Sequence, residues 1–141
     1  MGYDFVIFDA PPQGLFQECA IYSADLLVIP VPVDYAAMDG AAQILNMVSH
    51  MQRREQLTAV PVLIVPMFVD NRTNETRTNL ELIQHRFVQQ VVVQVPARTR
   101  MREAIAEGLT IFEFAPKEDI SAIYQELIQQ IVATLAPIES E

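Results

Sequence analysis

The chain has 141 residues and a mass of 15.9 kDa; 51% of its residues are hydrophobic and 19% are charged. This length and composition predict one folded domain with a sizeable core and argue against a disordered protein. The formal net charge of -9 disfavours a surface that binds nucleic acid or anionic membrane throughout, although it leaves a local basic patch open.

The first half of the chain alternates apolar runs with helical patterns. A strand is predicted over residues 4–8, because the continuous apolar run Phe5–Phe8 is typical of a parallel strand covered on both faces. A short helix, a second strand and a long helix are then predicted over Leu15–Ser23, Leu26–Val31 and Tyr35–Gln56. Asp34 is placed to cap the long helix.

The second half continues the alternation. A third strand is predicted over Val60–Phe68, and a polar loop leads into a helix that ends near Phe87. A fourth strand, a short helix stopped by Gly108, and a final amphipathic helix are predicted over Val91–Val95, Arg100–Glu107 and Ile120–Leu135.

This alternation predicts an α/β fold with a mostly parallel sheet flanked by helices. In such sheets ligands bind beyond the carboxyl ends of the strands. Asp9, Asp34, Asp70 and Pro96 follow or end the predicted strands. We therefore expect functional residues in these four places.

Asp9 follows the first apolar run directly, and Pro11-Pro12-Gln13-Gly14 comes soon after. A carboxylate at the end of a buried strand can hold a metal-bound water and so anchor Mg²⁺ beside a nucleotide. Each proline biases the residue before it away from helix, and Gly14 permits an approach that a side chain would block. The residues alone leave a plainer interpretation open, in which Asp9 ends a strand and the prolines make a turn.

Four stretches resemble one family of nucleotide-dependent proteins. DFVIFDAPPQG is similar to the Walker B and switch II segment of the ParA/MinD/Soj partition ATPases, a branch of the deviant Walker P-loop proteins. SADLLVIPVPVDYAAMDGAAQIL resembles the family's hydrophobic strand, Pro-Val pair and following helix. DNRTNETRTNL and VPARTRMREAIAEGLTIFEFAP resemble its Arg-Thr-Asn loop and its late proline-arginine loop. The resemblance covers essentially all 141 residues in the family's order.

The resemblance implies a partial deviant-Walker P-loop fold, Mg-ATP as cofactor, and a homodimer that holds nucleotide between its subunits. Asp9 then takes the Walker B role and reaches magnesium through water. Pro11, Pro12 and Gly14 form the switch that responds to the γ-phosphate. The positions that match the family's nucleotide-binding loops are Met67, Phe68, Pro96 and Arg98. Met67-Phe68 stands where some members carry an asparagine that reads adenine, which leaves the base specificity open.

The chain departs from the family in its phosphate-binding loop. The family's glycine-rich loop with two lysines cannot be formed here, because the chain has four scattered glycines and a single lysine, Lys117. We therefore expect residues 1–141 to be a single domain, the C-terminal portion of a ParA-like ATPase domain, that does not hydrolyse ATP alone. The family's strand beside residues 3–9 is also missing, so we expect exposed apolar edges that pair with a second copy or another chain.

For the intact protein the resemblance implies ATP-dependent positioning of chromosomal or plasmid DNA, with a stimulating partner of the ParB type. The alternative is a non-enzymatic interaction module that keeps the fold and dimer surface and binds a full-length relative or another partner. The arginines that can contact nonspecific DNA through its phosphates are Arg72, Arg77, Arg98, Arg100 and Arg102. The plainer interpretation is that solvated arginines pair with Glu103 and Glu107.

Cys19, the single cysteine, excludes an internal disulfide and is expected to be a small buried hydrophobe. No apolar run approaches the ~18 residues needed to span a bilayer, and nothing at the start resembles a secretion signal. We therefore expect a soluble, cytoplasmic protein without an integral membrane segment.

Overall fold

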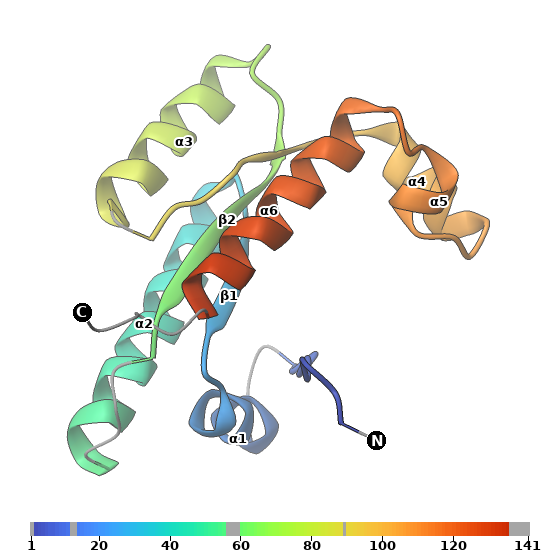
Figure 1. Cartoon of the computed structure of the whole chain (residues 1–141). Coiled ribbons are helices and arrows are strands. Elements are labelled where there is room, and N and C mark those ends of the chain that lie inside the picture. Colours follow the sequence, from blue (N-terminus) through green and yellow to red (C-terminus); the bar gives the residue numbers. More distant parts are fainter. Residues whose placement is uncertain (1, 12–13, 56–59, 89, 136–141) are drawn as a thin grey trace, which may run out of the picture.

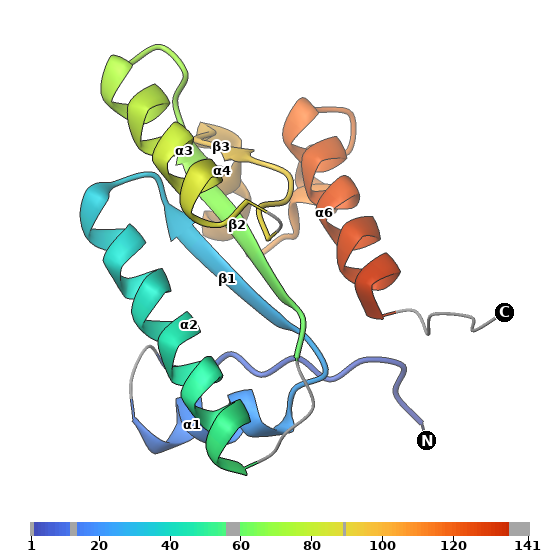
Figure 2. The ribbon, with the colours of Figure 1, turned by 90° about the vertical axis from the view of Figure 1, so that its left-hand side faces the viewer.

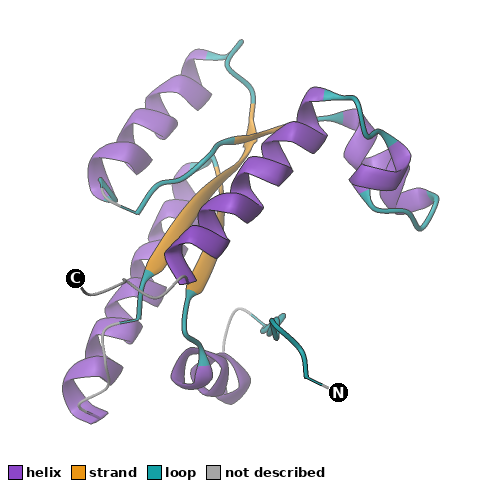
Figure 3. Ribbon diagram, in the orientation of Figure 1, coloured by secondary structure: helices purple, strands orange, loops and turns teal. Residues whose placement is uncertain are grey.

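The structure, a computed structural model, is an α/β arrangement in which a sheet of three parallel strands carries helices on both faces (Figure 1, Figure 3). It describes residues 2–11, 14–55, 60–88 and 90–135. The strands are β1 (Leu27–Pro32), β2 (Val62–Val69) and β3 (Val95–Pro96). The helices are α1 (Leu15–Ser23), α2 (Tyr35–Glu55), α3 (Asn74–Arg86), α4 (Thr99–Ala106), α5 (Ile111–Phe114) and α6 (Asp119–Leu135). The predicted fold class is confirmed.

β2 is the central strand, because β1 pairs with it on one side and β3 on the other. The predicted fourth strand, Val91–Val95, is mostly wrong: pairing there is limited to a bridge at Val91 and to the short β3. The backbone N–H of Val92 donates to the carbonyl of Ile64 in β2 at 3.0 Å, whereas the N–H of Val93 donates to Oε1 of Gln130 at 3.1 Å. A side chain of α6, and not a further strand, therefore satisfies the outward amide of this segment.

Helices cover both faces of the sheet (Figure 2), and a cluster of buried side chains lies on each face. On the face covered by α2 and α3 these are Ile29, Val31, Met38, Ala41, Ile64, Ile83 and Phe87. On the face covered by α4, α5 and α6 they are Val65, Val95, Ala104, Ile111, Ala115, Ile120 and Leu127. Ile64 and Val65 are neighbours on β2 and belong to different clusters, so the central strand is buried on both faces, as its continuous apolar run predicts.

The N-terminal segment is the part where the sequence prediction fails most clearly. The strand predicted over residues 4–8 is wrong, since the segment is irregular and pairs with no strand of the described sheet. Its large side chains are exposed, Tyr3 at 83% and Ile7 at 91%. A strand forms only when its backbone N–H and C=O groups find partners, and this segment pairs with none of the described strands, although the outer side of β1 is open. The segment lies instead near α1 and the amino-terminal end of β1 (Figure 1).

Local capping signals set several helix ends. The backbone N–H of Ala37 donates to Oδ1 of Asp34 at 2.8 Å, which confirms the predicted cap of α2. Gly108, with a φ of +68°, follows the end of α4 in the left-handed conformation that terminates helices.

Two features of the helices differ from expectation. Cys19 is exposed rather than buried, because the side of α1 that is buried is that of Ile21. The single turn α5 was not predicted. A capping box holds it, in which Thr110 and Glu113 exchange side-chain and backbone hydrogen bonds.

Candidate functional site

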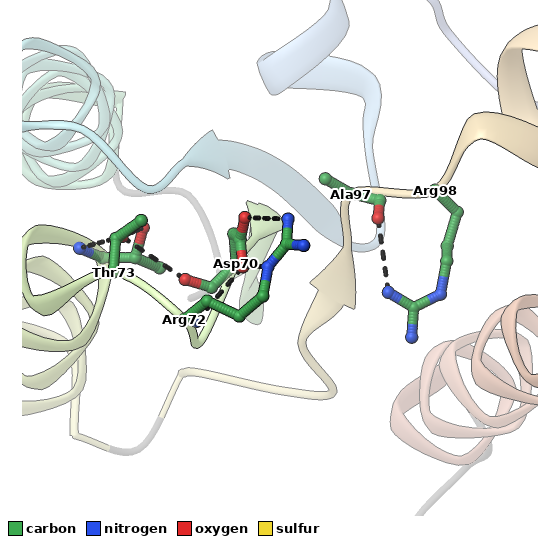
Figure 4. A network of polar contacts seen from close by, with 6 residues as sticks. Asp70, Arg72, Thr73, Ala97 and Arg98 are labelled. Carbon is green, nitrogen blue, oxygen red and sulfur yellow. Dashed lines mark hydrogen bonds and ion pairs between the residues drawn. The ribbon is translucent and has the colours of Figure 1, made fainter.

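The chain leaves β2 and β3 through two loops, residues 70–73 and 97–98, which we call the carboxyl-edge loops. Ligands of parallel sheets bind beyond the carboxyl ends of the strands, so these loops form the candidate site. A backbone hydrogen bond connects them, since the N–H of Ala97 donates to the carbonyl of Val69 at 3.2 Å. Figure 4 shows polar side chains of both loops from close by.

Asp70 and Arg72 form a bidentate ion pair within the first loop (Figure 4). Nε and Nη2 of Arg72 donate to the two carboxylate oxygens at 2.8 and 2.6 Å, and its backbone N–H donates to Oδ1 at 3.1 Å. The bond from the Arg72 side chain is the main cause that lowers the pKa of Asp70 to about 2. Thr73 then caps α3, since its hydroxyl accepts from the backbone N–H of Thr76 at 3.2 Å.

Arg98 ties the second loop to the first turn of α6. Its Nη2 donates to Oδ2 of Asp119 at 2.6 Å, and its Nη1 donates to the carbonyl of Ala97 at 3.3 Å (Figure 4 draws the second bond). The bond from Arg98 lowers the pKa of Asp119, and the same bond raises the pKa of Arg98. The two side chains are 42% and 54% exposed, so water screens the pair, which orients the loop more than it stabilises the fold.

Phe68, near the end of β2, has a left-handed backbone conformation. Its φ of +58° is the one positive φ outside glycine among the described residues. Phe68 lies at a register shift between Met67, which pairs with Val95, and Val69, which pairs with Pro96. Its side chain is 63% exposed, whereas that of Val69 is buried. The pairing of the residues before and after it therefore holds Phe68 in this conformation, which costs a residue with a side chain about 1–3 kcal/mol.

The predicted site residues fall into two groups that the structure does not bring together. The group at the carboxyl edge is Met67, Phe68, Pro96 and Arg98. Asp9 and Pro11 instead line a cavity of about 550 Å³ together with residues of α1. Gly14 precedes α1 with a φ of +95°, a conformation that favours glycine. Pro12 lies outside the described residues.

Among the described residues, Asp9 is not part of a cluster of metal-ligating side chains. Magnesium is held by oxygen ligands and ordered waters in a near-octahedral geometry. Across the part of the chain that the structure describes, no three His, Cys, Asp or Glu side chains are grouped to hold a metal ion. The expectation that Asp9 ends a buried strand is wrong, because residues 4–8 lie outside the sheet and Asp9 is exposed. Its metal role stays a prediction.

Arginines predicted for DNA contact are engaged with protein groups. Besides the ion pairs of Arg72 and Arg98, Arg100 pairs with Glu103 at 3.0 Å and with Glu118 at 3.4 Å. Arg77 donates to the side-chain oxygen of Asn74. A DNA phosphate would have to compete with carboxylates for three of these guanidinium groups, which lowers the gain from each contact. Arg102 is exposed on α4.

A groove of about 1490 Å³ separates the N-terminal segment from the sheet. Its walls are residues 3–10, the first part of β1 with the residues before it, and the C-terminal half of α6, where Ile128 is 47% and Val132 is 43% exposed. In the described sheet β1 is an edge strand, so the side of it away from β2 is unpaired. The predicted exposure of apolar edges is therefore present in the structure.

The sequence is similar to known proteins over most of its length. An AAA domain model (AAA_31) matches residues 1–60. The chain is 30% identical over 133 residues to the sporulation initiation inhibitor protein Soj of Bacillus subtilis. This match covers 93% of the chain and 53% of the relative. It is 27% identical over 136 residues to the chromosome-partitioning ATPase Soj of Thermus thermophilus, covering 94% of the chain and 54% of the relative. The resemblance to the ParA/MinD/Soj family is confirmed.

The chain spans about half the length of the curated relatives it matches. A third member of this family, the chromosome partitioning protein ParA of Myxococcus xanthus, is 29% identical over 91% of the chain and 47% of its own length. Within the described residues, every helix is too short or too polar to cross a lipid bilayer.

Sequence reasoning from the partition family missed two features of the carboxyl edge. Asp119 lies 21 residues from Arg98, and no local pattern predicts that they pair. The left-handed Phe68 had no signal, because aromatic residues rarely adopt a positive φ. The cap at Thr73 did have one, since a threonine directly before a polar helical stretch is a common helix start.

Proposed function

We propose that this chain acts as the C-terminal portion of a ParA-like partition ATPase, which uses ATP to position chromosomal or plasmid DNA in the cytoplasm. The observation that carries the proposal is similarity over 93%, 94% and 91% of the chain to Soj and ParA proteins, two of them named for chromosome partitioning. A parallel sheet with a polar carboxyl edge supports it, because nucleotides bind at this edge in α/β proteins. The proposed partners are a second copy, a stimulating protein of the ParB type, and nonspecific DNA.

In this proposal the carboxyl edge holds the base of the nucleotide, with Pro96 at the end of β3, Arg98 in the loop after it, and Met67 and Phe68 near the end of β2. Mg-ATP, when bound, supplies the transferable phosphate. Asp9 reaches magnesium through water, and the switch residues Pro11, Pro12 and Gly14 respond to the γ-phosphate, only when residues 3–9 join the sheet. The groove beside β1 has room for the strand that the family places next to them.

The test begins with the size of the native polypeptide in the source cell, measured by immunoblot with an antibody against this chain. A band well above 15.9 kDa supports the proposal, and ATP hydrolysis is then measured in that longer protein with and without Asp9→Ala. We expect Asp9→Ala to abolish Mg²⁺-dependent hydrolysis. A longer protein that hydrolyses no ATP, or one whose hydrolysis survives Asp9→Ala, contradicts the proposal.

The second candidate function is a non-enzymatic interaction module. The unpaired edge of β1 and the exposed apolar side chains along the groove favour it, since such edges pair readily with other chains. Sedimentation of the 141-residue chain should show association that Val28→Lys, a charge on the open edge strand, weakens. Leu82→Lys, at a similarly exposed residue of α3, is the matched control. A monomer over a wide concentration range contradicts this function.

A further inference from the structure

The open side of β1 offers hydrogen-bond acceptors but few donors. The backbone N–H of Leu27 donates to the carbonyl of Pro61 at 3.0 Å, on the side of β2. Because successive backbone groups of a strand point to opposite sides, positions 28, 30 and 32 face away from β2. Pro30 and Pro32 have no N–H. Within β1 the open side therefore presents three carbonyls and a single N–H donor, that of Val28.

This imbalance disfavours the simplest association of two copies, in which one β1 pairs with the other. Each β1 would bring one N–H for three carbonyls, so most of the carbonyls between the two strands would stay without a donor. Prolines at an edge strand weaken pairing in this way. A segment that pairs with the open side of β1 must therefore bring its own N–H groups.

The groove beside β1 has apolar walls from both helical layers. Ile128 and Val132 of α6 line it from one face of the sheet, and Ile44 of α2 lines it from the other. These two helices cover opposite faces of the sheet (Figure 2). A strand in this groove would be covered on both faces, and such strands are apolar throughout rather than alternating.

Residues 4–8 meet both requirements. Each of the five has an N–H group, and Phe5–Phe8 are apolar without interruption. The side chains of Phe5–Phe8 are between 55% and 91% exposed, and the segment pairs with none of the described strands. Within one copy, however, residues 3–10 form the wall of the groove that faces β1. The segment that fills the space between this wall and β1 is therefore supplied by another copy.

We propose that residues 4–8 of one copy enter the groove of a second copy and pair there with β1, while the second copy does the same in return. The exchange uses the same surface on both copies, so it closes into a two-fold symmetric dimer. The two exchanged segments lie next to each other at the symmetry axis, and one sheet runs through both copies. The inference rests on the second candidate function, the interaction module, and adds which segment of the partner is recognised.

The test is sedimentation of the 141-residue chain carrying a charge on one or the other of the two pairing surfaces. Ile7→Glu charges the entering segment, and Val28→Lys charges the receiving strand. Phe16→Glu and Leu82→Lys are the matched controls, since both side chains are exposed and neither lines the groove. The two pairing variants are also mixed in equal amounts. In a mixed dimer one of the two pairings is intact, and the other brings opposite charges together.

We expect Ile7→Glu and Val28→Lys each to weaken association about tenfold or more, because each buries a charge, and neither control to change it. The mixture of Ile7→Glu with Val28→Lys should associate more strongly than either variant alone, whereas Phe16→Glu mixed with Val28→Lys should not. In the unchanged chain, amide hydrogen exchange of residues 5–8, followed by NMR, should slow as the chain concentration rises.

Association that Val28→Lys weakens and Ile7→Glu does not would overturn the inference and leave the interaction module standing. The same holds if the mixture of the two pairing variants is no stronger than either alone. Exchange of residues 5–8 that is slow at every concentration would also overturn the inference, because the segment would then pair within its own copy. A chain that stays monomeric over a wide concentration range refutes the interaction module, and the inference with it.

Discussion

Replacing Phe68 by glycine should leave the protein more stable than replacing it by alanine, which reverses the usual order in a strand. Both variants remove the same aromatic ring, so the loss of its packing cancels in the comparison. The variants differ in the Cβ atom, which is crowded by the backbone at the φ of +58° found here.

The size of the effect follows from two opposing terms. The left-handed conformation costs a residue with a Cβ about 1–2 kcal/mol, and glycine avoids this cost. Glycine also loses more conformational freedom on folding, which opposes the gain by about 0.5–1 kcal/mol. We therefore expect glycine to be favoured at position 68 by about 0.5–1 kcal/mol in the free energy of unfolding.

Urea unfolding followed by circular dichroism measures the difference. Val28 provides the control, because it is an exposed strand residue without a positive φ. There only the second term acts, so Val28→Ala should be more stable than Val28→Gly by about 0.5–1 kcal/mol. If alanine is the more stable residue at both positions, the backbone of Phe68 is not strained.

The carboxyl of Asp70 should titrate with a pKa of about 2 by NMR, because Arg72 stabilises its charged form. Since this pKa is below the usual value of 3.8, the ion pair contributes its full stabilisation above pH 3.8 and loses it as the pH falls toward 2. Arg72→Ala should raise the titration midpoint of Asp70, and an unchanged midpoint contradicts the ion pair. Ile64→Ala, at a side chain that is 0% exposed in β2, should lower the free energy of unfolding by about 2–5 kcal/mol in a denaturant titration. Thr110→Ala, which breaks the capping box of α5, should cost about 1 kcal/mol, and Thr110→Ser should recover most of that stability; equal stability of all three forms would argue against the cap.

Helices and their ends were predictable because their causes are local. The predicted start of α2 depends on Asp34, three residues from the amide that it caps, and the end of α4 depends on Gly108 next to it. The apolar spacing along α6 predicted its buried face in the same way, and Ile120 and Leu127 are buried there. The candidate site was predictable only in part, since its two loops follow predicted strands but Asp9 lies elsewhere.

The sequence by itself determined the two long strands, the five longer helices, the class of the fold and the resemblance to partition ATPases, because hydrophobic period, capping and motifs depend on neighbouring residues. Only the tertiary structure decided which apolar runs became strands, because a strand needs a backbone partner from elsewhere in the chain. Val62–Val69 finds partners on both sides, whereas residues 5–8, which are also apolar, find none among the described strands. The same reason explains Phe68 and Arg98, whose conformations depend on β3 and on Asp119, far along the chain.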